Sequence, residues 1–413
     1  MAYHCEVRTT CRFCGSKDLQ QYIDLGDQPP SNSFIKAAVI AQEEDFPLRV
    51  NLCRACGLSQ LTHTVSARDI FDEYAYLSST SRALVQHYQE LVDGLIKQHA
   101  PAPGSLVVDI GANDGIMLDR YPAGFRPVGV EPSSAGAAAE KKGHVILRTF
   151  FDEPVAEQLV AKHGKAKLAT ITNVFAHIDE IHTVVRGFAK LMDTDGVLVI
   201  EFPYVIDTID QLFFDTIYHE HLCYLAVSPI ARLFATVGMR PFHAKRVAVG
   251  ASGPAVQLSL CLNDAPHKSD GSVEALLKLE QDWGLTDSAR YEGFSKRVQD
   301  RGAEIRALLD KLKAEGKTIA AFAAPAKGNT LLNAYGLSTD RLDAISENNA
   351  EKVGKVAPGS HIPVITDEDF LARKYDYALL LAWNYADFFV KNAAFVKQGG
   401  KFIIPLPNLV IAP

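Results

Sequence analysis

The sequence predicts an α/β protein of more than one domain: a Rossmann-like domain in the middle, a four-cysteine metal module before it and a smaller α/β domain after it. The chain has 413 residues, which is too long for one ordinary domain. Two Cys-x-x-Cys pairs lie near the N-terminus, and an apolar run ends in a glycine-rich turn at Asp109–Gly115. A second apolar run, followed by a helix-opening turn, begins at Thr318. We therefore expect domains at 1–68, 69–265 and 266–413.

Composition excludes several classes of protein. The chain is 47% hydrophobic and 22% charged, so it has enough apolar surface to fold. Its longest apolar runs, such as Val197–Ile200 and Ala378–Trp383, fall far short of the roughly 18 residues of a membrane span, and the N-terminus is too polar for a signal peptide. The net charge is −7, and residues 1–68 contain as many acidic as basic residues. We expect a cytoplasmic protein that binds neither nucleic acid nor membrane.

Four of the seven cysteines form two knuckles, each followed by a glycine. In such a pair a tight turn directs two thiolates at one metal ion, and four soft ligands suit tetrahedral zinc. The alternatives are two disulfides, which a reducing compartment disfavours, or four unrelated thiols. A site closed by Cys11, Cys14, Cys53 and Cys56 has no open position for substrate, so we expect the zinc to be structural. The long segment between the knuckles is expected to have secondary structure of its own.

A nucleoside-binding pattern follows a predicted helix at 81–98. Residues 106–108 are apolar and lead into Asp109-x-Gly111-x-x-x-Gly115, which predicts a buried strand, a glycine turn and a helix that begins near Gly115. Glycines let a backbone approach a ligand closely, and a helix N-terminus offers free N–H groups. A second strand is predicted at 127–131, and its last residue, Glu131, can accept the ribose hydroxyls of an adenosine.

The glycine turn does not fit a dinucleotide cofactor. With Gly111 as the first glycine of a G-x-G-x-x-G motif, Asn113 and Ile116 occupy the other two glycine positions. The turn and its strand-end acid instead resemble motif I of class I S-adenosylmethionine methyltransferases. Two further predicted strands fit that order: 168–172, followed by N-V-F-A-H, and 196–201, whose end faces the same crevice.

The resemblance implies the class I methyltransferase fold with S-adenosylmethionine as cofactor. Asp114 is expected near the methionine portion, and Asn173–His177 matches the family's adenine-side loop. The cofactor-binding residues that it implies are Asp109, Gly111, Asn113, Asp114, Gly115, Glu131, Asn173 and His177. The alternative is an α/β domain with an idle crevice.

The densest cluster of titratable groups lies at Asp215–Tyr224. If this segment is helical, Tyr218 and His221 share a face, and Glu220 lies about 100° round from His221. A tyrosine, a histidine and a carboxylate are suited to remove a proton beside a carbonyl and to stabilise the enolate. The alternatives are structural histidines, or a metal pair formed by His219 and His221.

Together, the two knuckles, the glycine turn and the motifs N-V-F-A-H, E-F-P-Y and Y-H-E-H resemble the C-methyltransferases that act on nucleotide-linked deoxysugars. The resemblance spans the whole chain, and Y-H-E-H is its most specific element. It implies an NDP-4-keto-6-deoxyhexose substrate methylated at C3, with C5 excluded only by analogy. His221 would remove the C3 proton as general base, and Tyr218 and Glu220 would orient or polarise the substrate and the base. The enolate would then attack the methyl of S-adenosylmethionine.

Two further tyrosine positions are candidates for substrate contact. Phe71–Tyr76 resembles the family's lid, with Tyr76 preferred over Tyr74 as the residue that reaches the sugar. The alternative is that both tyrosines pack a domain junction. Tyr204, which follows the third predicted strand, is another expected substrate contact.

The remaining chain predicts the end of this sheet, then helices, then a second α/β unit. Residues 239–247 and 254–262 alternate as paired strands, and 273–315 has a helical pattern. Where the family has a His-Gly-Gly-Ser-type turn, this chain has Gly250–Pro254. A last strand at Gly400–Pro405 is expected to close the second sheet.

The second α/β unit offers candidates for binding the nucleotide. Lys327 and Asn329 lie in a predicted helix-opening loop that resembles the family's G-K-G-N-T motif and can hold a diphosphate. Trp383 and Asn384 follow a predicted strand and can stack on and hydrogen-bond a nucleobase. The alternatives are a plain strand-to-helix turn and an aromatic packed under a loop.

Three other functions compete with a sugar C-methyltransferase. An O- or N-methyltransferase would need no enolate stabiliser, and an NAD-dependent reductase or epimerase is opposed by the failed dinucleotide motif. The third is a zinc adaptor without catalysis. The sequence does not determine the nucleotide base, the sugar configuration, the C3 substituent, or whether the protein is a monomer or a dimer.

Overall fold

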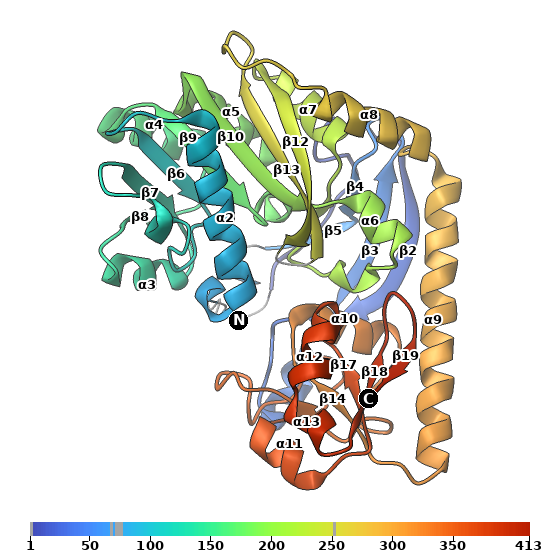
Figure 1. Ribbon diagram of the computed structural model, residues 1–413. Coiled ribbons are helices and arrows are strands. Elements are labelled where there is room, and N and C mark those ends of the chain that lie inside the picture. The colour runs from blue at the N-terminus through green and yellow to red at the C-terminus, as the bar shows by residue number, and fades with distance from the viewer. Residues whose placement is uncertain (1–2, 67–68, 71–76, 251–252) are drawn as a thin grey trace.

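The computed structural model of the protein describes residues 3–66, 69–70, 77–250 and 253–413. Figure 1 shows a large central sheet flanked by helices, a blue N-terminal sheet beside it, and a smaller C-terminal sheet below both. A long helix runs along one side of the molecule between the upper and lower parts. No helix in the described ranges is both long and apolar enough to cross a membrane.

The metal module consists of two antiparallel sheets. Strand β1 (Cys5–Val7) pairs with β5 (His63–Val65), while β2 (Leu19–Gln28), β3 (Phe46–Cys53), β4 (Ser59–Leu61) and β11 (Cys223–Tyr224) form a four-stranded sheet; a 3-10 helix, η1 (Ala37–Gln42), lies between β2 and β3. The segment between the knuckles therefore has its own secondary structure, as predicted. Because β11 comes from the predicted reactive segment, this sheet joins the metal module directly to the central domain.

The central sheet has seven strands in the order β12-β13-β10-β9-β6-β7-β8. They are β6 (Leu106–Ile110), β7 (Arg126–Val130), β8 (Val145–Leu147), β9 (Ala166–Thr172), β10 (Met192–Pro203), β12 (Met239–Gly250) and β13 (Gly253–Leu262). The strands from β10 to β8 are parallel, and β13 pairs antiparallel with β10 and β12. Both the Rossmann-like domain and its antiparallel pair are as predicted. Strand order reverses between β6 and β9, and ligands of open α/β sheets bind at such switch points.

Helices cover both faces of this sheet (Figure 1). They are α2 (Arg82–His99), α3 (Ala135–Lys141), α4 (Glu153–His163), α5 (Ile181–Leu191), α6 (Val205–Asp210) and α7 (Val227–Ala235), with the 3-10 helices η2 (Ser78–Thr80), η3 (Leu118–Arg120), η4 (Phe175–His177) and η5 (Phe214–Thr216). Helix α2 begins where predicted because the Ser81 hydroxyl accepts from the Leu84 N–H.

The helix predicted to begin near Gly115 is wrong. Gly111, Asn113 and Gly115 have φ angles of +76°, +49° and +83°, so the backbone leaves the right-handed helical region at every second residue of the turn. Only the short η3 follows before Pro122.

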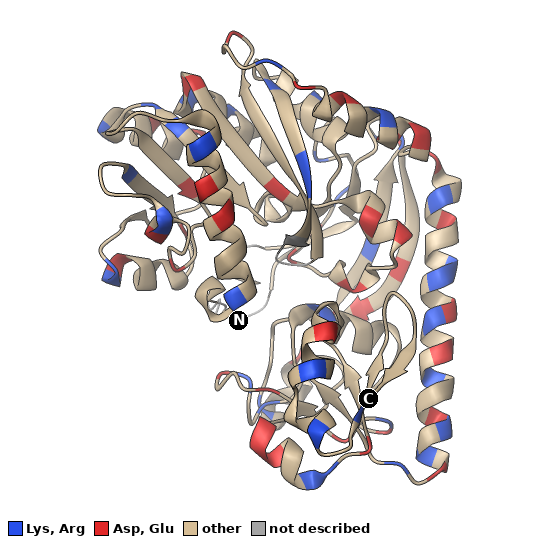
Figure 2. Cartoon of the chain, viewed as in Figure 1, with Lys and Arg blue, Asp and Glu red and all other residues tan. Residues whose placement is uncertain are grey.

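The predicted connector consists of α8 (Ser272–Trp283) and α9 (Ser288–Ala314). Helix α9 has 27 residues and is therefore about 40 Å long. Basic and acidic residues are interspersed along it (Figure 2). The helix contacts all three parts: Tyr22 of β2 packs on Tyr291 with ring centroids 4.7 Å apart, Arg297 donates to the last carbonyls of α6, and Arg301 donates to the Pro405 carbonyl.

The C-terminal sheet has the order β16-β15-β14-β17-β18-β19. Its elements are β14 (Ile319–Phe322), α10 (Ala326–Ala334), β15 (Ile345–Ser346), β16 (Val364–Ile365), α11 (Asp367–Arg373), β17 (Tyr377–Leu380), η6 (Trp383–Tyr385), α12 (Ala386–Asn392), α13 (Ala394–Lys397), β18 (Lys401–Ile404) and β19 (Val410–Ala412). The strand predicted to close the sheet is not its edge, because β19 turns back and pairs antiparallel with β18.

A strap from the metal module, residues 31–43, lies on the C-terminal unit. The Asn329 amide donates to the Ser31 carbonyl at 2.7 Å, and the Glu43 carboxylate accepts from His361 Nε2 at 2.7 Å and from the Gly359 N–H. Since strands and straps cross between the parts, the boundaries 1–68, 69–265 and 266–413 stay a prediction.

Candidate active site

Four thiols of the metal module converge on one point. The Sγ atoms of Cys11, Cys14, Cys53 and Cys56 lie within 4.8 Å of one another, close enough to hold one metal ion. The Cys11–Cys56 and Cys14–Cys53 Sγ distances are both 3.6 Å, far longer than the ~2.05 Å of a disulfide. The thiols are therefore free, and the disulfide alternative is wrong. Four thiolates, two from each knuckle, fit a closed tetrahedral zinc site.

Glu131 holds the glycine turn in place. Its carboxylate accepts from the backbone N–H groups of Asn113 and Ser133, each at 2.8 Å. A side chain at Gly111 would be strained, because the backbone has φ of +76° and a Cβ there would lie 2.3 Å from Cγ2 of Val174. The carboxylate thus lies after β7, beside the turn and at the switch point of the sheet.

Two buried oxygens near this turn lack hydrogen-bond partners within the described part of the chain, Oδ1 of Asp114 and Oδ1 of Asn173. The Asn173 amide nitrogen is already committed, since it donates to the Tyr88 hydroxyl at 3.1 Å. A buried acceptor without a donor costs free energy until a ligand satisfies it. S-adenosylmethionine carries suitable donors in its ammonium, ribose hydroxyl and adenine amino groups. The residues present therefore fit this cofactor.

Two other predicted cofactor residues make structural contacts. The Asp109 carboxyl accepts from the Thr170 hydroxyl at 2.6 Å, and burial raises the pKa of Asp109 to about 7. A Cβ at Gly115 would lie 2.9 Å from the His144 ring and 3.1 Å from Cβ of Ala139, so glycine lets the turn pack closely. Direct contact of Asp109 and Gly115 with the cofactor stays a prediction.

A buried Glu201–His87 pair lies at the end of β10. The Glu201 side chain is fully buried, and its carboxylate lies 2.8 Å from His87 Nε2 and accepts from the Gln257 amide at 2.8 Å. Sequence analysis missed His87. The available signal was a carboxylate at the end of an apolar strand, whereas nothing in the local sequence of α2 marks its partner.

The predicted base is packed among rings. The His221 ring stacks on that of His177 with centroids 5.0 Å apart, and the Tyr218 ring lies 4.0 Å from it on centroids. Nδ1 of His221 lies 2.7 Å from the Thr216 carbonyl oxygen, which can only accept. The proton of the neutral imidazole is therefore on Nδ1, and Nε2 is the basic nitrogen. Burial lowers the pKa of His221 to about 4, so the ring is neutral near pH 7.

The helix assumed for this segment is wrong, although Tyr218 and His221 do meet. Helix η5 ends at Thr216, and a turn closed by a 2.9 Å bond from the His221 N–H to the Tyr218 carbonyl leads into β11. A turn places residues three apart on one side much as a helix does, so Tyr218 and His221 lie together as predicted. His219 goes elsewhere: its Nε2 donates to the Phe46 carbonyl at 3.2 Å, which does not support a metal pair.

Glu220 faces a different neighbourhood from the one predicted. Its carboxylate accepts from the Asn32 amide of the strap at 2.6 Å, and the charge of Lys352 in the C-terminal unit lies close enough to affect it. Burial raises the pKa of Glu220 to about 7. Glu220 therefore lies at the junction of the three parts, and its catalytic role stays a prediction.

A second group of unsatisfied atoms lies between the central domain and the C-terminal unit. Lys327 Nζ and Asp215 Oδ1 are buried without hydrogen-bond partners in the described ranges. Burial lowers the pKa of Lys327 to about 8, and the neighbouring carboxylate opposes that shift. Asn329 Oδ1, on the same helix as Lys327, is likewise buried and unpartnered among the described residues. Sequence analysis assigned no role to Asp215.

The Trp383 side chain is buried among protein groups. Lys327 Nζ lies 3.8 Å from its ring centroid, Phe213 packs on it at 4.8 Å, and its indole N–H donates to the Asp215 carboxylate at 2.6 Å. The expectation that this ring stacks on a nucleobase is therefore corrected: in this arrangement Trp383 holds Lys327 and Asp215. Asn384 Oδ1 is buried and unpartnered in the described chain, so its role as a ligand contact stays a prediction.

Two predicted substrate contacts remain, Tyr204 and Tyr76. Tyr204 is fully buried, and its hydroxyl donates at 2.9 Å to Glu280, which also accepts from the first N–H groups of α7. This contact gives Tyr204 a structural role in place of the expected substrate contact. Tyr76, with Tyr74 and the predicted lid, lies outside the described residues.

Comparisons with known proteins cover the chain from end to end. Family models match in order: a zinc binding domain at residues 11–71, a methyltransferase domain at 84–243 and a C-methyltransferase C-terminal domain at 251–407. The C-methyltransferase NovU of Streptomyces niveus is 34% identical over 402 residues, which are 96% of this chain and 95% of that protein.

Two solved methyltransferase structures each match less than half of this chain. The magnesium protoporphyrin IX methyltransferase of Synechocystis PCC 6803 with bound SAH is 18% identical, covering 43% of this chain and 83% of its own with a TM-score of 0.33. An S-adenosylmethionine-dependent methyltransferase of Clostridium acetobutylicum is 8% identical, covering 43% and 92% with a TM-score of 0.34. The assignment therefore depends on the sequence relative and the three family models. On that basis the chain belongs to the zinc-containing family of S-adenosylmethionine-dependent C-methyltransferases.

Proposed function

We propose that the protein methylates C3 of an NDP-4-keto-6-deoxyhexose, with His221 as the general base. The observation that carries the proposal is the hydrogen bond from Nδ1 of His221 to the Thr216 carbonyl at 2.7 Å. It puts the ring proton on Nδ1 and leaves Nε2 as the proton acceptor. Membership of the methyltransferase family excludes the NAD-dependent enzyme and the adaptor without catalysis. The alternative function that we test is an O- or N-methyltransferase.

The substrate class follows from what an imidazole can deprotonate. A ketone at C4 acidifies the hydrogen on C3, because the electron pair of the broken C–H bond moves into an enolate on the ketone oxygen. Nε2 of His221 takes that proton and passes it to solvent after the reaction. His177 and Tyr218 hold the base ring on its two sides, which keeps Nε2 in one direction. When bound, S-adenosylmethionine supplies an electrophilic methyl group and leaves as S-adenosylhomocysteine.

Lys327 is the residue we assign to the diphosphate. An ammonium buried without a hydrogen-bond partner is costly, and an anionic ligand would offset that cost. Trp383 and Asp215 restrict where the ammonium can lie. Asn329 and Asn384 are further candidate contacts to the nucleotide. The sugar would then extend from this cluster towards His221, which lies in the same segment as Asp215.

The test separates proton removal from methyl transfer. The protein is incubated with an NDP-4-keto-6-deoxyhexose in deuterated water without S-adenosylmethionine, and deuterium at C3 is followed by NMR. Wild type should exchange the C3 hydrogen, and His221→Asn should not, while its calorimetric affinity for S-adenosylhomocysteine is retained. His182→Asn, an exposed histidine of α5, is the matched control and should behave as wild type.

Products of the complete reaction are then identified by mass spectrometry and NMR. A methyl group bonded to carbon at C3 is expected. A methyl on oxygen or nitrogen, with no C3 exchange in wild type, would replace the proposal by the O- or N-methyltransferase.

A further inference from the structure

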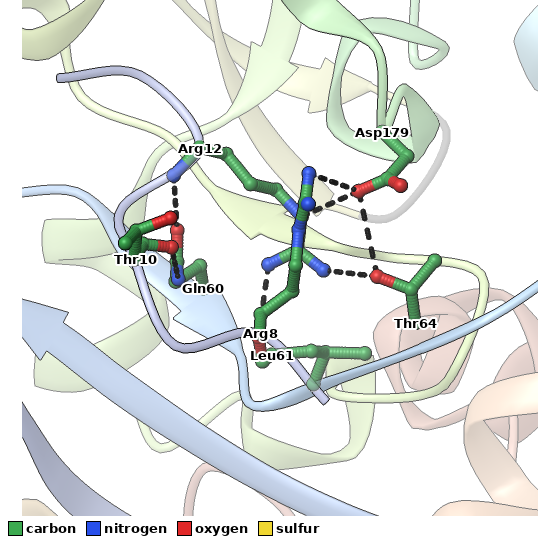
Figure 3. Close-up of polar contacts among 7 residues, drawn as sticks. All are labelled: Arg8, Thr10, Arg12, Gln60, Leu61, Thr64 and Asp179. Carbon is green, nitrogen blue, oxygen red and sulfur yellow. Dashed lines mark hydrogen bonds and ion pairs between the residues drawn. The ribbon is translucent and has the colours of Figure 1, made fainter. Parts of the chain in front are cut away.

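The first knuckle of the metal module contacts the central domain close to the proposed base, His221. Arg12, between Cys11 and Cys14, has a fully buried side chain, and each of its three guanidinium nitrogens donates a hydrogen bond (Figure 3). Nη1 donates to the Leu61 carbonyl at 2.9 Å and Nη2 to the Thr64 hydroxyl at 2.6 Å, both inside the module. Nε donates to the Asp179 carboxylate at 3.1 Å, which lies in the central domain. The guanidinium therefore bridges the two parts in one fixed orientation.

Both residues between the first two cysteines contact the loop that carries His177. Arg12 binds Asp179, and the neighbouring Phe13 packs edge-on against Phe175 with ring centroids 6.2 Å apart. The two contacts lie two residues on either side of His177. A loop held at both ends cannot shift its middle residue freely, so the knuckle restricts where the His177 ring lies, together with Phe234, which stacks on Phe175 at 5.9 Å.

The His177 ring is in turn one wall of the base. It stacks on His221 with an interplanar angle of 20°, and the Tyr218 ring also packs on His221, with centroids 4.0 Å apart. The Thr216 carbonyl holds Nδ1 but leaves rotation about that bond to be limited by the rings. A displaced His177 would therefore let the His221 ring turn and let water reach it.

We propose that Arg12 is a positioning residue for the reaction: through Asp179 it fixes the His177 loop, and through that loop the orientation of His221. The inference rests on the proposed function, in which His221 is the base. It assigns to the zinc module a catalytic consequence in addition to its structural one. Arg8 also binds Asp179, at 3.0 Å, but its side chain is part-exposed, so Arg12 supplies the buried and more rigid contact.

The second knuckle provides an internal control. Its arginine, Arg54, follows Cys53 as Arg12 follows Cys11, but the Arg54 side chain is 53% exposed and binds Asp18 within the module at 2.6 Å. The two knuckles thus offer the same residue at the same place beside the metal ligands. Only the first is connected to the His177 loop in the contacts of the described chain.

The experiment compares Arg12→Gln and Asp179→Asn with Arg54→Gln in the full-length zinc-loaded protein. Bound zinc and the midpoint of thermal unfolding are measured first. The first two variants should keep zinc, since all four cysteines remain, and should lose about 100-fold in the rate of C3 exchange. Arg54→Gln should exchange like wild type. The double variant Arg12→Gln/Asp179→Asn should be no slower than the slower single variant, because both changes break one connection.

A second readout does not depend on turnover. The ring signals of His221 are followed by NMR against pH, with His221→Asn used for assignment; His177 and Tyr218 are the titratable groups packed on it. A loosened loop would let water reach the ring, so the pKa of His221 should rise towards 6.5 in Arg12→Gln and in Asp179→Asn. It should stay unchanged in Arg54→Gln.

The outcomes distinguish the two ideas. If wild type fails to exchange the C3 hydrogen, the proposed function fails. If wild type exchanges but Arg12→Gln and Asp179→Asn match Arg54→Gln in rate and in the His221 titration, the function stands and the positioning role is overturned. If Arg12→Gln loses zinc or does not fold, Asp179→Asn, which leaves the knuckle intact, decides the question.

Discussion

At the scale of the residue, burial sets the chemistry of the site. His177 and His221 are half-buried among rings and backbone, and desolvation lowers the pKa of both, that of His221 to about 4. A neutral imidazole is the form that accepts a proton, so burial keeps the base ready for use. The single bond to Thr216 then decides which of its two nitrogens is basic. Tautomer and charge are thus both determined by contacts that no local sequence pattern describes.

The low pKa predicts the pH dependence of catalysis. The base must be neutral in the free enzyme, so kcat/KM should fall with decreasing pH only as the pH approaches about 4, rather than near the ordinary histidine value of 6.5. For stability, the folded pKa lies below the unfolded one, so the unfolded chain binds more protons and stability declines as pH falls from about 6.5 towards 4. Steady-state rates between pH 4.5 and 8, with unfolding monitored in parallel, check this. An acid limb near 6.5 in folded protein would contradict it.

At the scale of the element, the glycine turn is shaped by close approach. Gly111 combines φ of +76° with a Val174 methyl 2.3 Å from where a Cβ would lie. Gly104, just before β6, has φ of +85° but nothing within 4 Å of that position. A side chain at either glycine would therefore have the same unfavourable left-handed backbone. Only at Gly111 would it also clash with Val174.

This pair predicts a difference between two alanine variants. Gly104→Ala should lose only the backbone cost of about 1–2 kcal/mol in unfolding free energy. Gly111→Ala should lose more and also weaken S-adenosylhomocysteine binding, because Val174 and the turn must move apart. Urea unfolding and calorimetry measure both effects. Equal losses in the two variants, with cofactor affinity intact, would show that the turn tolerates a side chain.

At the scale of the whole molecule, the three parts are held together by elements that cross between them. Strand β11 completes the metal module's sheet, the strap at 31–43 lies on the C-terminal unit, and α9 contacts all three parts. The strap also delivers Asn32 to the buried Glu220. The metal module therefore contacts both the central domain and the C-terminal unit.

This arrangement predicts the result of removing the metal. Cys14→Ser should lower bound zinc and reduce the thermal midpoint by about 10 °C, because zinc binding contributes folding free energy. Turnover should fall, whereas S-adenosylhomocysteine binding to the central sheet should persist. Cys5→Ser removes a thiol outside the cluster and serves as control. Unchanged zinc content in Cys14→Ser would exclude Cys14 as a ligand.

Sequence patterns were reliable where a structure is locally encoded. The buried strands, helix α2 and the two knuckles follow from hydrophobic period and cysteine spacing. The patterns failed where contacts distant in sequence decide: the turn after Gly111, the non-helical Tyr218–His221 segment and the enclosed Trp383. In each of these, backbone conformation or burial depends on residues from another part of the chain.

The sequence by itself therefore determined the order of the three parts, the four thiols and the residue types gathered for proton removal. Only the tertiary structure decided which partners those residues have. Glu220 accepts from Asn32 of the strap, Trp383 packs against Lys327, and His177 lies between the first knuckle and His221. The physical reason is range. Propensity and periodicity act over a few residues, whereas a pKa, a tautomer or a stacked ring depends on every group within a few ångströms, however far apart those groups lie along the chain.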